Sequence, residues 1–293
     1  MPLTAEPPAA TAAPPADGPD ALRVVPVRHP WRWVAVTVTA VLLAQFVHGL
    51  VTNPAWEWGV FAQYVFAPAV LHALGTTLQL TAYGTALGFA LGIVLAFARL
   101  SASPFLRAVA HGYVWVFRSV PLIVQLLFWF NLAYLYRRID VGVPFGPGFF
   151  SFATMDLVGP MGAAVLGLAL HQAAYAAEIV RGGVLAVDAG QREAAAALGI
   201  PRLRQLRRIV LPQAMRAIAP NAANEVVSLF KGTSIVSVMA IGELFYQVQV
   251  IYGRNGRVVP LLMVATVWYA LLTGALSLLQ HHAERHFAKG ATR

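Results

Sequence analysis

The chain alternates between long apolar runs and short polar connections, as expected of a chain that crosses a lipid bilayer repeatedly. The apolar runs lie at about 33–51, 76–98, 114–136, 160–180, 221–243 and 258–280. Each is close to the roughly 20 residues that a helix needs to cross the hydrocarbon core. The pattern therefore predicts an all-α polytopic membrane protein with six spans, and no internal repeat is visible along it.

The two ends of the chain differ from the spans. Residues 1–30 are rich in Pro and Ala and lack apolar periodicity, so we expect a disordered tail there. The first span lies within 31–52; its small residues also allow a cleaved signal peptide, but it is long for a signal core. We expect residues 286–293 to form the second tail.

Basic residues in the connections predict the orientation of the spans. One side of the predicted topology carries only Arg137, Arg138, Arg254 and Arg257. The other side carries Arg23, Arg28, Arg32, Arg99, Arg107, Arg181, Arg192, Arg202, Arg204, Arg207, Arg208, Arg216, Arg285, Lys289 and Arg293. Positive charge favours the cytoplasmic side, so both termini and the long loop 181–220 are expected in the cytoplasm.

Composition narrows the possible functions. Only 11% of residues are charged, against about 25% in soluble domains. The net charge of +9 follows from the basic cytoplasmic loops, so we expect no nucleic-acid partner. The absence of cysteine excludes disulfides and thiolate chemistry.

The sequence also lacks the motif of a phosphate-binding loop, in which a lysine follows a glycine. The two lysines of the chain, Lys231 and Lys289, do not follow a glycine, and no catalytic or metal motif appears.

The cytoplasmic loop contains a charged stretch, "GQREAAAALGIPRLRQLRR". Residues 191–198 favour a helix, and Gly199 is placed to end it in a left-handed cap. Pro201 suits the first position of a second helix, whose apolar face faces the membrane surface. The flat alanine surface of the first helix suits a groove in another protein, although anchoring on lipid headgroups explains it as well.

Polar residues inside the spans are costly and therefore candidates for function. Gln125 lies in the third span, where Pro121 is expected to kink or start the helix. For Glu178 we expect either an ion pair with Arg181 or a functional role. For Lys231 we expect either a place in the lining of a translocation path or hydrogen bonds to carbonyl groups near Gly232. The candidates on the fifth span begin with Asn224 and Glu225, and those near its outer end are Glu243, Tyr246 and Gln247.

Three glycines of the second span recur every four residues. Gly84, Gly88 and Gly92 share one helix face, where small residues let another helix approach closely. Chance is the alternative in a chain with 24 glycines.

Several motifs together resemble the permeases of ABC transporters. "GQREAAAALG" is similar to their EAA loop, with Ala189 where members often have Pro. "TLQLTAYGTALGFALGIVLAFARLS", "FRSVPLIVQLLFWF", "VLPQAMRAIAPNAANEVVSLFKGTSIVS" and "IGEL" follow the order found in the polar amino acid uptake branch. The resemblance covers 70–285 and implies a five-helix permease core preceded by one extra span. It gives Arg118 a structural role.

The resemblance also implies partners and sites. The short helix of the loop becomes a coupling helix in a cytoplasmic ABC ATPase dimer, flanked by Arg192, with contacts at Gly190, Gln191, Glu193, Ala194, Ala195, Leu198 and Gly199. The translocation path or gate is assigned to Gln125, Asn224, Lys231, Thr233 and Ser234. ATP and Mg bind the partner ATPase, so this chain needs no cofactor of its own.

The implied protein is a multi-pass permease subunit of a bacterial cytoplasmic membrane. It is not itself an enzyme, and it imports polar amino acids. Its expected partners outside the cytoplasm and in the membrane are a solute-binding protein, a second copy or a related permease, and membrane lipid. The alternative is an ion-gradient-driven secondary transporter or channel. Such a protein needs no coupling loop and often carries matched internal repeats.

Overall fold

The computed structural model describes residues 30–143 and 148–288. Within these ranges, four helices are long and apolar enough to cross a membrane, and two bent helix pairs raise the number to six. The four are α1 (Pro30–Thr52), α3 (Pro68–Leu100), α8 (Pro160–Leu185) and α13 (Val258–Ala288). The prediction of a helical polytopic protein is therefore confirmed. Most of the two predicted tails, 1–29 and 289–293, lies outside the described residues, but α13 continues three residues into the second tail.

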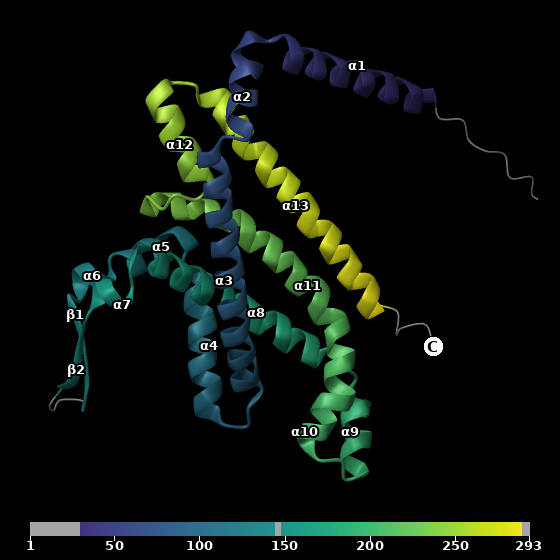
Figure 1. Cartoon of the computed structure of the whole chain (residues 1–293). Helices are drawn as coiled ribbons and strands as arrows, with labels where there is room; N and C mark the ends of the chain where they lie inside the picture. Colours follow the sequence, from purple (N-terminus) through teal and green to yellow (C-terminus); the bar gives the residue numbers. More distant parts are fainter. Residues whose placement is uncertain (1–29, 144–147, 289–293) are drawn as a thin grey trace, which may run out of the picture. The chain divides into compact units, whose positions relative to one another are not determined.

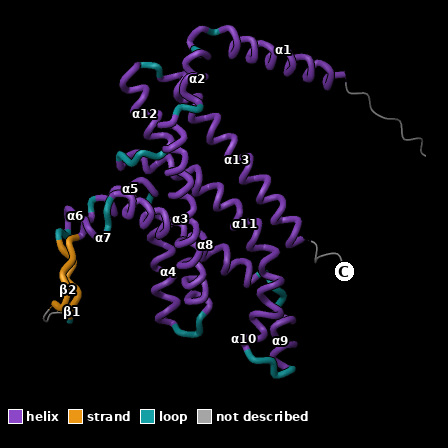
Figure 2. The backbone as a smooth tube through the Cα atoms, viewed as in Figure 1, coloured by secondary structure: helices purple, strands orange, loops and turns teal. Residues whose placement is uncertain are grey.

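The chain divides into two units. The first ends at Asn53 and contains α1, the extra span, whose side chains from 31 to 49 are all exposed within the structure. The second begins at Pro54 and contains all later elements (Figures 1 and 2). Its shorter elements are η1 (Pro54–Trp56), α2 (Trp58–Val65), α4 (Pro104–Ser119), α5 (Leu122–Phe130), α6 (Leu132–Leu135), β1 (Arg138–Gly142), β2 (Gly148–Ala153), α7 (Thr154–Leu157), α9 (Ala189–Ala197), α10 (Arg202–Gln205), η2 (Leu206–Val210), α11 (Leu211–Gly232), η3 (Thr233–Met239) and α12 (Leu244–Asn255).

Helices α3 and α8 pack closely along the predicted glycine face. A Cβ atom added to Gly88 would lie 2.5 Å from the Cβ of Gln172, and one added to Gly92 would lie 2.5 Å from the Cβ of Ala176. A Cβ atom added to Gly84 would lie 3.2 Å from the Cβ of Leu168 on α8 and 3.1 Å from the Cδ2 of Leu229 on α11. The three glycines thus permit backbone contact between helices, and the packing interpretation is confirmed.

The third span is not one helix over 114–136, as the apolar run had predicted. Helix α4 begins at Pro104, and it meets α5 at a bend of 103°. Pro121 lies at this bend, as expected, because its ring nitrogen carries no hydrogen for a helical bond. Gln125 Nε2 donates to the carbonyl oxygens of Phe117 and Val120, at 2.9 and 2.7 Å. The amide thus satisfies carbonyl groups that the broken helix leaves free.

The fifth span also differs from its predicted bounds. Helix α11 starts at Leu211, ten residues before the predicted start at 221, and the chain turns by 46° before α12. Glu243 was expected at the outer end, meeting solute, a partner or the membrane interface. It is instead fully buried, and its carboxylate accepts from the backbone N–H groups of Phe245 and Tyr246 and from the hydroxyl of Tyr269. Glu243 therefore caps α12.

A two-stranded hairpin interrupts the helical pattern between α6 and α7. Strands β1 and β2 pair antiparallel, with Ile139 opposite Phe152 and Val141 opposite Phe150 (Figure 2). It lies in the connection predicted between the third and fourth spans, for which the sequence pattern had predicted no secondary structure.

Candidate functional site

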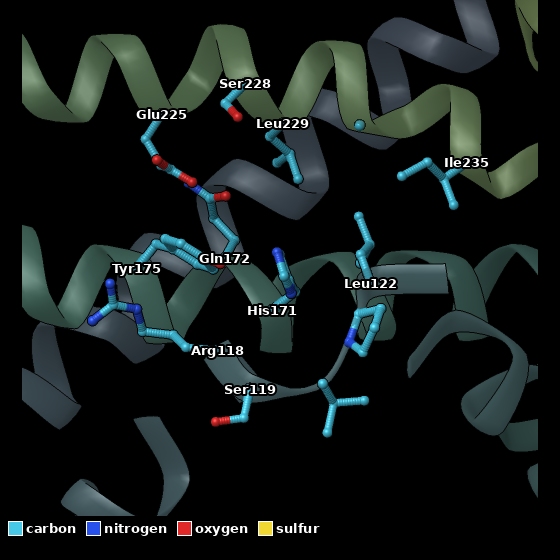
Figure 3. A pocket seen from close by; sticks show the side chains of 13 residues that line it. Arg118, Ser119, Leu122, His171, Gln172, Tyr175, Glu225, Ser228, Leu229 and Ile235 are labelled. Carbon is cyan, nitrogen blue, oxygen red and sulfur yellow. The ribbon is translucent and has the colours of Figure 1, made fainter. Parts of the chain in front are cut away.

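A cavity of about 480 Å³ lies where the bend between α4 and α5 faces α8 and α11 (Figure 3). The break in the third span places Arg118 and Ser119 at its rim, and α8 and α11 supply its walls. The described lining is Arg118, Ser119, Val120, Pro121, Leu122, His171, Gln172, Tyr175, Glu225, Ser228, Leu229, Gly232 and Ile235. Both a cation and a carboxylate therefore line one open space between these helices.

Aromatic side chains of α8 surround the cationic group of this cavity. The guanidinium carbon of Arg118 lies 5.3 Å from the ring centre of Tyr175, within cation–π range. The Tyr175 ring also contacts the ring of His171, with 4.9 Å between centres. In Figure 3, Glu225 on α11 and Gln172 on α8 extend toward each other across the cavity. The arrangement can bind a solute that carries both charges.

Two buried side-chain atoms of the cavity lining have no hydrogen-bond partner among the described residues. They are Gln172 Nε2 and His171 Nδ1, and both atoms are buried. Gln172 is only 1% exposed. A buried polar group without a partner costs about 1–3 kcal/mol, so the site favours a polar ligand or water that bonds to these atoms.

The sequence-predicted path residues lie near this cavity but do not line it. Gln125 bonds within the bend, and Asn224 Oδ1 accepts from Gln280 Nε2 at 2.9 Å. The hydroxyl groups of Thr233 and Ser234 donate to the carbonyl oxygens of Phe230 and Lys231, at 2.6 and 2.8 Å. Lys231 itself is exposed. Other residues of the same segment, Glu225, Ser228, Gly232 and Ile235, face the cavity instead.

Sequence reasoning missed the contribution of α8. His171, Gln172 and Tyr175 stand in "LALHQAAYAAE", and their spacing places them close together on one helix. Polar side chains in an apolar span were the signal that could have found them. Arg118, which had been given a structural role, also lines the cavity.

At the end of α8, Glu178 forms ion pairs with Arg99 and Arg181. Arg181 Nη2 lies 2.8 Å from Glu178 Oε2. The predicted pairing of Glu178 with Arg181 is confirmed, and the structure adds Arg99 from α3.

The loop 181–220, which was predicted to be cytoplasmic, forms a helix, a sharp corner and a second helix, at the end of α8 and α11 remote from α12 (Figure 1). Gly199 has φ +66°, so the predicted left-handed cap is confirmed. The N–H of Ile200 donates to Ala195 O and that of Gly199 to Ala196 O, both at 3.0 Å, which is the Schellman pattern. Pro201 precedes the second helix by one residue and is not its first residue.

Of the residues of this loop that were predicted to contact an ATPase, one is buried and the others are exposed. Ala195 is 2% exposed and is buried by its own chain. It therefore supports the helix from inside and presents no surface. Gln205 Nε2 donates to Arg192 O at 2.9 Å and ties the second helix to α9. The other predicted residues are exposed: Gly190, Gln191, Glu193, Ala194, Leu198 and Gly199.

Comparison with known proteins gives a consistent result. A family model described as "binding-protein-dependent transport system inner membrane component" matches residues 88–289. The arginine transport system permease protein ArgU of Corynebacterium glutamicum is 40% identical over 94% of this chain and 86% of that protein. The nopaline transport system permease protein NocM of Agrobacterium fabrum is 36% identical, over 74% of this chain and 87% of that protein.

Solved structures agree with the sequence relatives. A crystal structure of an amino acid ABC transporter with histidines has a chain that is 31% identical, with a TM-score of 0.64 over 77% of this chain and 97% of that one. A chain of the MetNI methionine ABC transporter in an inward-facing conformation is 20% identical, with a TM-score of 0.59 over 76% of this chain and 96% of that one. The second similarity supports the fold.

Proposed function

The chain belongs to the family of binding-protein-dependent transport system inner membrane components, and from this premise we propose that it is the permease subunit of an ATP-driven importer of polar amino acids. Arginine is the first substrate to test, because the arginine permease ArgU is similar along 94% of the chain. The observation that carries the proposal is the cavity between α4–α5, α8 and α11. It presents Arg118 and Glu225 to one solute.

The proposed chemistry follows from these two charges. A free amino acid carries a carboxylate and an ammonium group, which suit a guanidinium and a carboxylate respectively. Gln172 Nε2 and His171 Nδ1 offer further bonds. The residues predicted earlier for the path, Asn224 and Lys231 on α11 and Thr233 and Ser234 at the start of η3, then lie beside the cavity. A second copy or a related permease completes the path.

Permeases of this family work with an ATPase and a binding protein. We assign the ATPase contact to the exposed face of α9 and its corner. Leu198 is 78% exposed there and offers an apolar anchor for a groove. ATP and Mg bind the partner ATPase dimer, and the solute-binding protein docks on the opposite side. The chain is a multi-span membrane permease of a bacterial transport family; we place both termini in the cytoplasm.

The alternative of an ion-gradient-driven transporter loses its support. The family match covers the loop and the spans from residue 88 onward, and related proteins are named as permeases of transport systems.

Replacing Glu225 by Gln is expected to raise the KM for arginine uptake about tenfold, because a charged hydrogen bond to the solute is lost. Arg118→Gln should act similarly through the carboxylate. Uptake of radiolabelled arginine by cells that lack the native permease measures both. Glu57→Gln is the control, because this carboxylate pairs with Arg257 and does not line the cavity. Equal KM values in Glu225→Gln and the unaltered chain would contradict the pocket assignment.

A further inference from the structure

Helix α4 has three distinct faces. One is buried and contains Ala110 and Val114. A second is exposed and apolar, with Phe105, Val109 and Val116. The third is exposed and cationic, and it carries Arg107, His111, Trp115 and Arg118 at helical spacing. Hydrocarbon can cover the second face, but charged groups within a span face a water-filled cavity or the bundle interior.

Three hollows, two new ones and the cavity described above, follow the cationic face and share lining residues with one another. The first, of about 720 Å³, is lined by Arg99, Arg107, Ala108, His111, Gly112 and Trp115. The second, of about 340 Å³, shares Arg99, His111 and Trp115 with the first. It also shares Arg118, Ser119 and Tyr175 with the central cavity. The shared residues join the cytoplasmic end of α4 to the cavity at its other end.

Cations outnumber carboxylates along this route. Arg99, Arg107 and Arg118 line the first and second hollows. Among the described lining residues of these two hollows, Glu178 is the one carboxylate, and it lines the second. Glu178 is already paired with Arg99 and with Arg181 from outside the route. Arg99 also lies 3.2 Å from His111 Nδ1. Arg107 and Arg118 have no described acidic partner in an ion pair, so the lining has capacity for an anion.

We propose that this series of hollows, here named the cationic track, is the inner half of the translocation path and guides the solute carboxylate from the cavity to the cytoplasm. Arg118 holds the carboxylate in the cavity, and Arg107, the other cation of the track without a described acidic partner, offers a further position along α4. The inference rests on the proposed function for the identity of the solute whose carboxylate group is guided. Its geometry depends only on the hollows and their lining.

The chain contains no cysteine, so single cysteines can report access directly. Ala108→Cys and Ser119→Cys place thiols in the track, at its cytoplasmic end and at the cavity. Val109→Cys and Val116→Cys are matched controls on the apolar face of the same helix. The whole transporter is labelled in inside-out membrane vesicles, with a sulfonate-bearing and a trimethylammonium-bearing methanethiosulfonate reagent.

The track thiols are expected to react about tenfold faster than the control thiols. At the track they should favour the anionic reagent by about tenfold over the cationic one, relative to a free thiol. Adding Arg107→Gln should reduce that preference at Ala108→Cys. If the track and control thiols react at equal rates, the hollows do not form an aqueous route. If access is present without anion preference before and after Arg107→Gln, the cationic role is wrong.

The labelling does not depend on which solute is carried or on how transport is driven. Arginine uptake by the cysteine-free parent chain is measured in parallel. Normal ATP-dependent uptake with unreactive track thiols would overturn the track alone, and the proposed function would stand. Reactive, anion-selective track thiols without arginine uptake would overturn the proposed substrate and support the track.

Discussion

Replacing Gly199 by valine is expected to abolish solute uptake and to leave the chain inserted in the membrane. Gly199 has φ +66° and ends α9 in a left-handed cap. A residue with a Cβ atom costs about 1–2 kcal/mol in that conformation, and a β-branched one costs more. The corner between α9 and α10 should therefore reorganise, and ATP hydrolysis should no longer drive uptake.

The control is Gly199→Asn, because asparagine adopts the left-handed conformation more readily than valine. Space does not limit either change, since no atom of the described residues, other than Gly199 and its two chain neighbours, lies within 4 Å of a Cβ added at this position. Uptake and ATPase activity are measured in the same vesicles. Normal coupled uptake in Gly199→Val would show that the cap is not needed for coupling.

Replacing Gly92 by leucine is expected to remove most folded protein from the membrane. An added Cβ would lie 2.5 Å from Ala176 Cβ and 3.0 Å from Ala173 O, and neither atom belongs to a flexible side chain. Helices α3 and α8 would have to separate, at a cost of about 3 kcal/mol or more. The thermal midpoint of the detergent-purified chain, followed by fluorescence, measures the loss.

Gly75→Leu provides the matched control for this prediction. Gly75 lies on the same helix, and nothing lies within 4 Å of its added Cβ. Its thermal midpoint should stay close to that of the unaltered chain. Equal stability of Gly92→Leu and Gly75→Leu would contradict close packing along the glycine face.

Local patterns predicted much of this molecule because their causes are local. The length of apolar runs gives the number of spans, since bilayer thickness sets it. The stretch "AAAALGIP" fixes a helix end because Gly199 is the residue that adopts a positive φ most easily. The Gly84–Gly88–Gly92 spacing predicts a contact surface because only small residues permit that approach.

The features that the sequence did not predict depend on contacts between segments that are distant along the chain. The bend at Pro121 was expected, but its 103° angle and the bonds of Gln125 follow from packing around the break. Glu243 looked like an outer polar residue until Tyr269, 26 positions later, was found beside it. The cavity joins segments near positions 120, 172 and 228, so no single stretch could reveal that Gln172 and Glu225 face each other.

The most direct test of the central claim is reconstitution. The purified chain is placed in proteoliposomes with its cognate ATPase and solute-binding protein, and labelled arginine uptake is measured with ATP or with an ion gradient. The account predicts uptake that requires ATP and the ATPase and that persists when ion gradients are collapsed. Uptake by the chain alone that follows an ion gradient and is unaffected by ATP would contradict it.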